Sequence, residues 1–119
     1  MDVNQLDEAM EITMRTKRKD GSWSSRPIWI VVVDDEAYVR SARGAQGEWY
    51  RKVRSGGQAE IAVDGQTLAV SLEPVHDESL NEQVTDAYRA KYAADSPGST
   101  EALTEGEPTT TTMRVAVPA

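Results

Sequence analysis

The sequence predicts a mainly β protein, a small antiparallel barrel with flanking helices, formed by one domain over residues 1–119. Short segments in which apolar and polar residues alternate recur along the chain, and turn sequences such as Asp64-Gly65 separate them. The length of 119 residues suits a single domain. Five or six strands in so short a chain favour a barrel, because a closed sheet has no unpaired edges.

Alternation with a period of two defines the strands. In the first, Ile12, Met14 and Thr16 fall on one face, and the Lys19–Ser22 turn then reverses the chain. The second, residues 27–33, is apolar on both faces, so other elements must cover each side. The strands are expected over residues 11–17, 27–33, 37–41, 59–63, 68–72 and 109–117.

Helical spacing and glycine positions predict the remaining elements. A short helix is expected within the glycine-rich segment 42–57. Ser79 and Glu82 have the spacing of a capping box, which predicts the start of a longer helix that Pro97-Gly98 ends. Helices are expected over residues 3–11, over 48–54 and from residue 79 onwards, and residues 96–108 are expected to form a polar loop.

The charge is unevenly distributed. The formal net charge is −7, yet residues 15–54 hold 10 of the 13 basic residues and only five of the 20 acidic ones. This segment therefore carries +5 and the remainder −12. A basic segment in an acidic protein favours a small anionic ligand over a nucleic acid, because the rest of the surface repels a long polyanion.

Composition excludes several classes of protein. The absence of cysteine rules out disulfides, thiolate metal sites and a cysteine nucleophile, and a single histidine argues against a zinc site. No apolar run approaches the ~20 residues that span a bilayer, and the charged N-terminal segment does not resemble a signal peptide. We expect a soluble cytoplasmic protein without a metal.

A basic and aromatic constellation is the candidate anion site. Arg40–Gly44 and Gly47–Lys52 combine arginines, whose planar donors suit phosphate, with glycines that let a ligand approach the backbone. A solvated loop with scattered charges is the alternative. Of the tryptophans, Trp29 is interpreted as a core residue. For Trp49 two interpretations stay open, packing of the short helix and contact with the flat ring of a ligand.

The chain resembles an uncharacterised bacterial family grouped with the FMN-binding split β-barrels, the superfamily of pyridoxamine-phosphate-oxidase-like and deazaflavin-dependent proteins. The resemblance rests on Glu11-Ile12, Arg15-Thr16, Asp20-Gly21, Arg26-Pro27-Ile28-Trp29, Tyr38-Val39-Arg40-Ser41, Gly44, Gly47 and Trp49, and later on Asp86–Tyr92 and the strand expected over 109–117. It implies a six-stranded antiparallel split barrel that forms a homodimer, with FMN or a deazaflavin near the dimer interface.

The resemblance also implies a set of cofactor-binding residues. Those expected to flank the ring system are Arg15, Thr16, Arg26, Pro27, Ile28 and Trp29. Those expected near the phosphate are Arg40, Ser41, Arg43, Arg51 and Lys52, and Trp49 completes the set. The implied activity is hydride transfer by a small oxidoreductase, and no residue stands out as the proton donor. The alternatives are a cofactor-free homodimeric binding or structural protein and, less favoured, a single-strand nucleic-acid binder.

Overall fold

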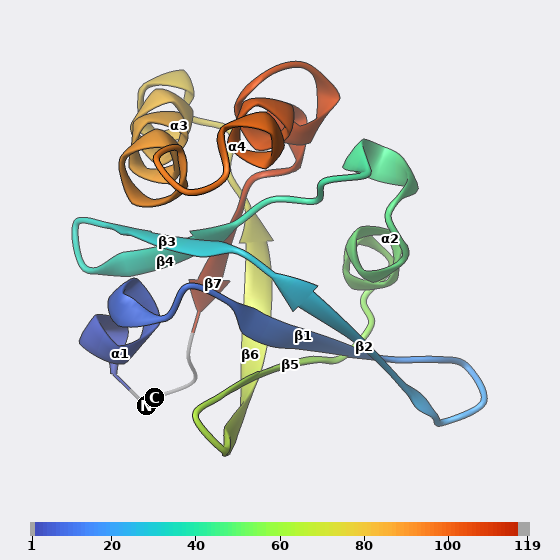
Figure 1. The fold of residues 1–119 in the computed structure, drawn as a ribbon. Coiled ribbons are helices and arrows are strands. Elements are labelled where there is room, and N and C mark those ends of the chain that lie inside the picture. The colour runs from blue at the N-terminus through green and yellow to red at the C-terminus, as the bar shows by residue number, and fades with distance from the viewer. Residues whose placement is uncertain (1, 117–119) are drawn as a thin grey trace.

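A computed structural model describes residues 2–116, which form one curled antiparallel sheet with helices around it (Figure 1). The helices are α1 (Val3–Glu8), α2 (Glu48–Arg54), α3 (Glu78–Tyr92) and α4 (Pro97–Thr104), with 3-10 turns η1 (Gly44–Gln46) and η2 (Glu107–Thr111). The strands are β1 (Ile12–Lys17), β2 (Trp23–Ile28), β3 (Ile30–Val33), β4 (Glu36–Val39), β5 (Ala59–Val63), β6 (Gln66–Pro74) and β7 (Met113–Ala116).

The sheet curls into a half-barrel whose two edges are neighbours in the chain. Its order is β2-β1-β5-β6-β7-β4-β3, and every pairing is antiparallel. The edge strands β2 and β3 are separated only by Trp29. The described chain thus has seven strands instead of the expected six, because the second strand begins earlier, at Trp23, and breaks at Trp29 where it passes from one edge to the other.

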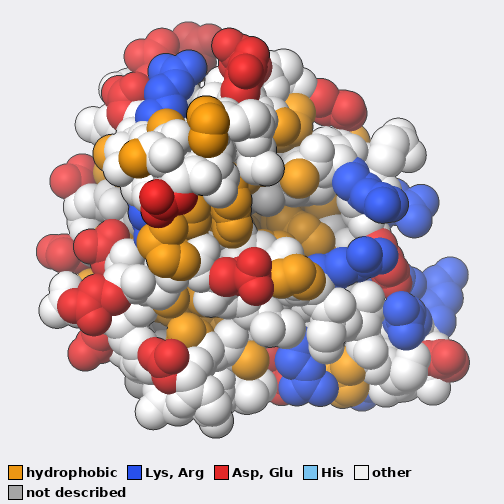
Figure 2. Space-filling model, viewed as in Figure 1, with side chains coloured by type: hydrophobic (Ala, Val, Ile, Leu, Met, Phe, Trp, Pro, Cys, Tyr) orange, Lys and Arg blue, Asp and Glu red, His pale blue; other side chains and the backbone are white. Residues whose placement is uncertain are grey.

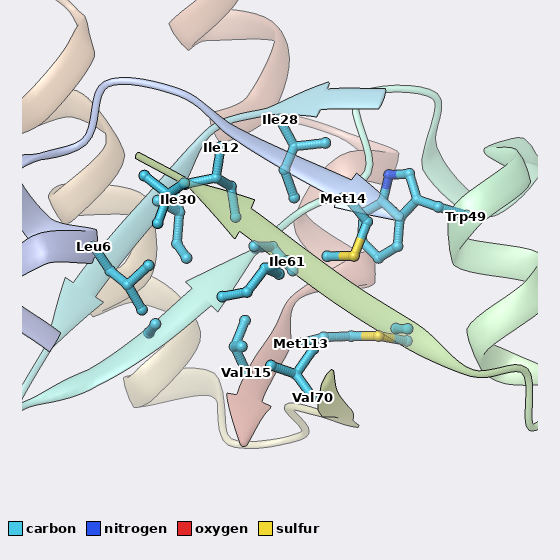
Figure 3. Packing of buried hydrophobic residues seen from close by; sticks show 14 residues of the cluster. Leu6, Ile12, Met14, Ile28, Ile30, Trp49, Ile61, Val70, Met113 and Val115 are labelled. Atoms are coloured by element: carbon cyan, nitrogen blue, oxygen red, sulfur yellow. The ribbon is translucent and has the colours of Figure 1, made fainter. Parts of the chain in front are cut away.

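The inward faces of the strands form the first hydrophobic core (Figure 3). Ile12, Met14 and Thr16 of β1 are all buried, as the alternation predicts. Trp49 reaches into this core from α2 and lies beside Met14 in Figure 3. The helix expected over 48–54 is therefore confirmed and packs through its aromatic residue against the barrel interior.

A second core lies on the outer face of β3 and β4, under α3 and α4. Val31 and Tyr38 pack there against Val84 and Tyr88 of α3. The hydroxyl of Tyr92 accepts a hydrogen bond from the Ile30 N–H (3.2 Å) and donates one to the Ile30 carbonyl (3.1 Å). Burial raises the pKa of Tyr92 to about 12, so its hydroxyl remains a donor at neutral pH. The expectation that the second strand is covered on both faces is confirmed.

The helical C-terminal region differs from the expected one. The N-cap of α3 is Asp77, whose carboxylate accepts from the Leu80 N–H, so the capping box at Ser79 is wrong. Pro97 does not end this helix, which stops at Tyr92; instead Pro97 occupies the first turn of α4. Proline suits that place, because the first helical N–H groups have no intrahelical acceptor. The prediction of a loop over 96–108 is thus wrong for Pro97–Thr104, which form α4.

The strand expected over 109–117 is shorter than the alternation suggests. Each of the hydroxyls of Thr109, Thr110 and Thr111 donates to the carbonyl oxygen three residues earlier, which stabilises η2 and takes these residues out of the sheet. β7 begins at Met113, and Val117 lies outside the described residues. The first helix also ends early, at Glu8. Over residues 2–116 no helix combines the length and the hydrophobicity that crossing a membrane requires.

Candidate functional site

A cleft of about 420 Å³ opens between the β2–Trp29 edge of the sheet, the loop after β4, the start of α2 and helix α4. It faces the viewer in Figure 2, as a hollow with an apolar floor between α4 and α2. The lining residues are Glu11, Arg26, Pro27, Ile28, Trp29, Arg40, Ser41, Ala42, Arg43, Gly47, Glu48, Trp49, Ser99, Ala102 and Leu103.

Aromatic and aliphatic side chains make up the floor. Trp49 is 7% exposed, so only a small part of its side chain reaches the cleft. Trp29 is half-buried and stacks on Tyr92 with ring centroids 4.1 Å apart and an interplanar angle of 5°. Because that stack fixes the orientation of the Trp29 ring, the floor is a preformed surface rather than a set of mobile side chains.

Basic side chains lie along one side of the mouth. Beside the cleft lies a more open depression of about 600 Å³, and the two share Arg26, Arg43 and Glu48. The other residues of the depression are Arg18, Lys19, Asp20, Arg51 and Lys52. We call the six basic residues of this depression the basic rim: Arg18, Lys19, Arg26, Arg43, Arg51 and Lys52. Figure 2 shows basic side chains gathered on this side of the molecule.

Part of the basic rim is already neutralised by one carboxylate. Glu48 accepts a hydrogen bond from Nε of Arg18 (3.2 Å) and lies 3.8 Å from a terminal nitrogen of Arg26. The hydrogen bond from Arg18 holds the pKa of the Glu48 carboxyl below its usual value. By contrast, within residues 2–116 no carboxylate forms an ion pair with Arg43, Arg51 or Lys52.

Arg40 lies in the wall of the cleft with its guanidinium turned into the protein. The residue is 2% exposed, and Nε donates to Oγ1 of Thr112 (2.8 Å). One terminal nitrogen donates to the Leu103 carbonyl (2.9 Å), and the other donates to the carbonyl and side-chain oxygens of Asn81 (both 2.9 Å). Burial lowers the pKa of Arg40, yet arginine remains charged at neutral pH. Arg40 therefore joins α3, α4 and Thr112, the residue between η2 and β7.

A close approach of two backbone segments shapes the loop between β4 and α2. The N–H of Ser41 donates to Oγ1 of Thr111 (2.9 Å), which anchors the start of the loop. A Cβ at Gly47 would lie 2.4 Å from Oγ of Ser41, so this position accepts no side chain without a shift. The glycine thus lets the first turn of α2 pack against the strand end that precedes it.

The structure brings most of the sequence-predicted residues together. Eight of them line the cleft: Arg26, Pro27, Ile28, Trp29, Arg40, Ser41, Arg43 and Trp49. Arg51 and Lys52 line the neighbouring depression. Arg15 and Thr16 line neither. Arg15 pairs with Glu60 (2.7 Å) and Thr16 is 1% exposed.

Sequence reasoning missed the residues that α4 and the β1–β2 hairpin contribute. Ser99, Ala102 and Leu103 form one wall of the cleft, in a segment expected to be a loop. The Ser96-Pro97 pair was the available signal, since serine followed by proline is typical of a helix N-terminus. Arg18 and Glu48 meet across 30 positions of sequence, and no local pattern predicts that contact.

Comparison with known proteins agrees with this architecture. The profile of a family described as "Uncharacterized protein conserved in bacteria (DUF2255)" matches residues 2–115. Among proteins of curated function none matches the chain by sequence.

Solved structures with the same fold include proteins named for cofactor chemistry. A putative pyridoxamine 5'-phosphate oxidase from Listeria innocua has a TM-score of 0.69 at 12% identity, over 98% of this chain and 90% of that one. The haem storage protein HutZ from Vibrio cholerae has a TM-score of 0.72 at 12% identity, over 98% and 87%. An F420-H2 dependent reductase has a TM-score of 0.65 at 16% identity, over 89% and 93%. These neighbours are split-barrel proteins, and at such identities the likeness shows the fold alone.

Proposed function

The chain belongs to this bacterial family, and we propose that it is a split-barrel protein that binds FMN or a deazaflavin in the cleft and acts as an oxidoreductase. One observation carries the proposal: a cleft of about 420 Å³ combines an apolar aromatic floor with a basic rim. Such a volume is within the usual range for small-molecule sites, ~300–1,000 Å³. The names of the structural neighbours, which include a putative pyridoxamine 5'-phosphate oxidase and an F420-H2 dependent reductase, support the same class of ligand.

The donor chemistry of the cleft fits an amphipathic cofactor. Trp29 would contact the ring system, because a flat apolar surface packs well against a planar heterocycle, and the small exposed parts of Ile28 and Trp49 would complete the floor beneath it. Arg43 and Arg26 at the mouth would hold the phosphate, since guanidinium donors match phosphate oxygens. This role for Arg26 replaces the contact with the ring system that the family resemblance implies. Bound there, the cofactor would supply hydride transfer to an acceptor. Arg40 would act indirectly, by holding α4 in place as a wall of the cleft.

The proposal includes a homodimer in the cytoplasm. The outward face of β5 and β6 carries small and polar residues such as Ala62, Ala69 and Ser71, and no helix within residues 2–116 packs on it (Figure 1). We propose that a second copy of the chain packs on this uncovered face of the sheet. The cytoplasmic location follows the charged, cysteine-free composition. Light scattering after size-exclusion chromatography tests the dimer, and a mass of 13.1 kDa in solution would contradict it.

Titration with cofactors tests the central claim. We expect the purified protein to bind FMN, or an oxidised deazaflavin, in a saturable way that visible absorption or flavin fluorescence detects. FMN should bind more tightly than riboflavin, which lacks the phosphate. Arg26→Gln should reduce this preference by about tenfold, because a hydrogen bond to a charged group contributes roughly 1.5–3 kcal/mol.

Arg89→Gln provides a matched control. The Arg89 side chain is 53% exposed, as is that of Arg26, and it also pairs with a carboxylate, but it lies on α3 outside the cleft. The Arg89→Gln variant should bind FMN and riboflavin with the same affinities as the unaltered protein. Equal weakening of FMN and riboflavin in Arg26→Gln would contradict the phosphate assignment. The absence of saturable binding by any flavin or deazaflavin would favour a cofactor-free homodimeric protein of the same fold.

A further inference from the structure

Glu48 occupies the place where the basic rim meets the cleft. It lines both the cleft and the adjoining depression, together with Arg26 and Arg43. Its side chain is 29% exposed, and its two oxygens face different cations, one Arg18 and the other Arg26. The carboxylate therefore links the turn after β1, which carries Arg18, to β2, which carries Arg26.

The charges around Glu48 exceed what it can neutralise. The depression holds Arg18, Lys19, Arg26, Arg43, Arg51 and Lys52 against two carboxylates, Asp20 and Glu48. Asp20 is engaged elsewhere, since it accepts from the N–H (2.9 Å) and the hydroxyl (2.6 Å) of Ser22. Glu48 is thus the acidic group that contacts the rim arginines, in a position where an anionic ligand would find the same donors.

We propose that Glu48 is an internal competitor of the ligand: its carboxylate holds Arg18 and Arg26 until an anion displaces it, and so sets which anions the rim accepts. This inference rests on the proposed function for the location of the ligand. A singly charged ligand gains little by exchange with a carboxylate of equal charge. A group with two negative charges, such as a phosphate monoester or a diphosphate, gains attraction from the same arginines and from Arg43. Glu48 therefore favours phosphorylated ligands over simple carboxylates.

Removal of the charge on Glu48 tests this role. Inorganic pyrophosphate is the probe, with its binding measured by isothermal titration calorimetry at low ionic strength, where surface charges are least screened. Glu48→Gln should bind pyrophosphate about fivefold more tightly than the unaltered protein, which is the expected effect of removing one like charge near ~4 Å in water. Added salt should reduce the difference.

Two further variants keep the test decisive. Glu60→Gln is the matched control, because Glu60 is 25% exposed and also pairs with an arginine, but on β5 outside both cavities. It should leave pyrophosphate binding unchanged. Glu48→Asp retains the charge at the start of α2 and shortens its reach to Arg18. The affinity of this variant for pyrophosphate should therefore fall between those of the unaltered protein and Glu48→Gln. Far-UV circular dichroism verifies that each variant is folded.

The outcomes separate this inference from the proposed function. Tighter pyrophosphate binding by Glu48→Gln alone supports the competitor role even if no flavin binds. Equal affinities in Glu48→Gln and Glu60→Gln, weaker binding in Glu48→Gln, or no pyrophosphate binding by any of the proteins would overturn it. Saturable flavin binding with any of those results would leave the proposed function standing without a competing role for Glu48.

Discussion

Replacement of Arg40 by methionine should destabilise the whole fold rather than merely weaken an anion site. Arg40 is 2% exposed, and its guanidinium donates to Thr112, Leu103 and Asn81. Its partners lie 72, 63 and 41 positions away in the sequence, so this single side chain connects distant segments. Methionine fills a similar volume but donates no hydrogen bond.

The magnitude follows from the groups that lose their donor. Leu103 is in the last turn of α4, where helical carbonyls have no intrahelical partner, so its oxygen would be left buried and unsatisfied. Such a loss costs about 1–3 kcal/mol, and each hydrogen bond to a charged group contributes roughly 1.5–3 kcal/mol. Within residues 2–116 the Arg40 guanidinium has no carboxylate partner, so methionine recovers part of its desolvation cost. We expect a net loss of about 2–4 kcal/mol in the free energy of unfolding.

Urea denaturation, monitored by tryptophan fluorescence, measures this loss. The midpoint should fall while the m-value stays the same. Arg43→Met is the control, because Arg43 is exposed and makes no ion pair within residues 2–116; its stability should change by less than about 0.5 kcal/mol. A loss below about 1 kcal/mol in Arg40→Met would refute the reasoning, since the carbonyls would then have other donors.

Three further substitutions test the local structure by the same denaturation assay. Gly47→Ala should lower the free energy of unfolding by about 1–3 kcal/mol, because its Cβ would lie 2.4 Å from the hydroxyl oxygen of Ser41. Gly98→Ala is the control and should not destabilise the fold, because its Cβ would have nothing within 4 Å. Equal effects of the two substitutions would contradict the close approach at Gly47. Tyr92→Phe should cost about 1–2 kcal/mol by removing both hydrogen bonds to Ile30, and an unchanged midpoint would show that these bonds are dispensable. Asp35→Gly should raise the free energy of unfolding by about 0.5 kcal/mol, since Asp35 has a φ of 66°, which glycine adopts without strain. A loss of stability would mean that the Asp35 side chain stabilises the turn.

Sequence patterns over a few neighbouring residues predicted the helices and strands whose ends are set by turn residues next to them. The helix over 48–54 and the strand over 59–63 have the expected bounds, because glycines and a hairpin turn delimit them in the sequence. The two-sided burial of the strand after Trp29 also follows from its composition, since Val31 has no polar neighbour along that strand.

Other features depend on contacts that no window of sequence contains. Trp29 breaks the second strand because its indole stacks on Tyr92 of α3, outside the barrel. Arg40 belongs to the basic segment by composition, yet its donors are taken by oxygens far along the chain, so its predicted contact with a phosphate is now in competition with protein acceptors. Its assignment as a ligand-binding residue stays a prediction, as do those of the other candidate residues.

The threonine-rich segment shows why composition misled the strand assignment. Threonine favours strands when its side chain packs on a sheet. Here the hydroxyls of Thr109 and Thr110 instead donate to nearby carbonyls and hold a 3-10 turn. The choice between the two depends on what the segment packs against, in this case Arg40 and Asn81.

The position of β7 between β4 and β6 has a consequence for synthesis on the ribosome. Every basic residue of the cleft and its rim precedes residue 53, whereas one wall of the cleft and a central strand of the sheet come from residues 97–116. A nascent chain that has exposed only its first 96 residues therefore presents β4 and β6 without the strand that pairs with both. Such unpaired edges are where chains associate wrongly. One wall of the cleft and the strand that covers these edges are thus both completed only after residues 97–116 have been synthesised.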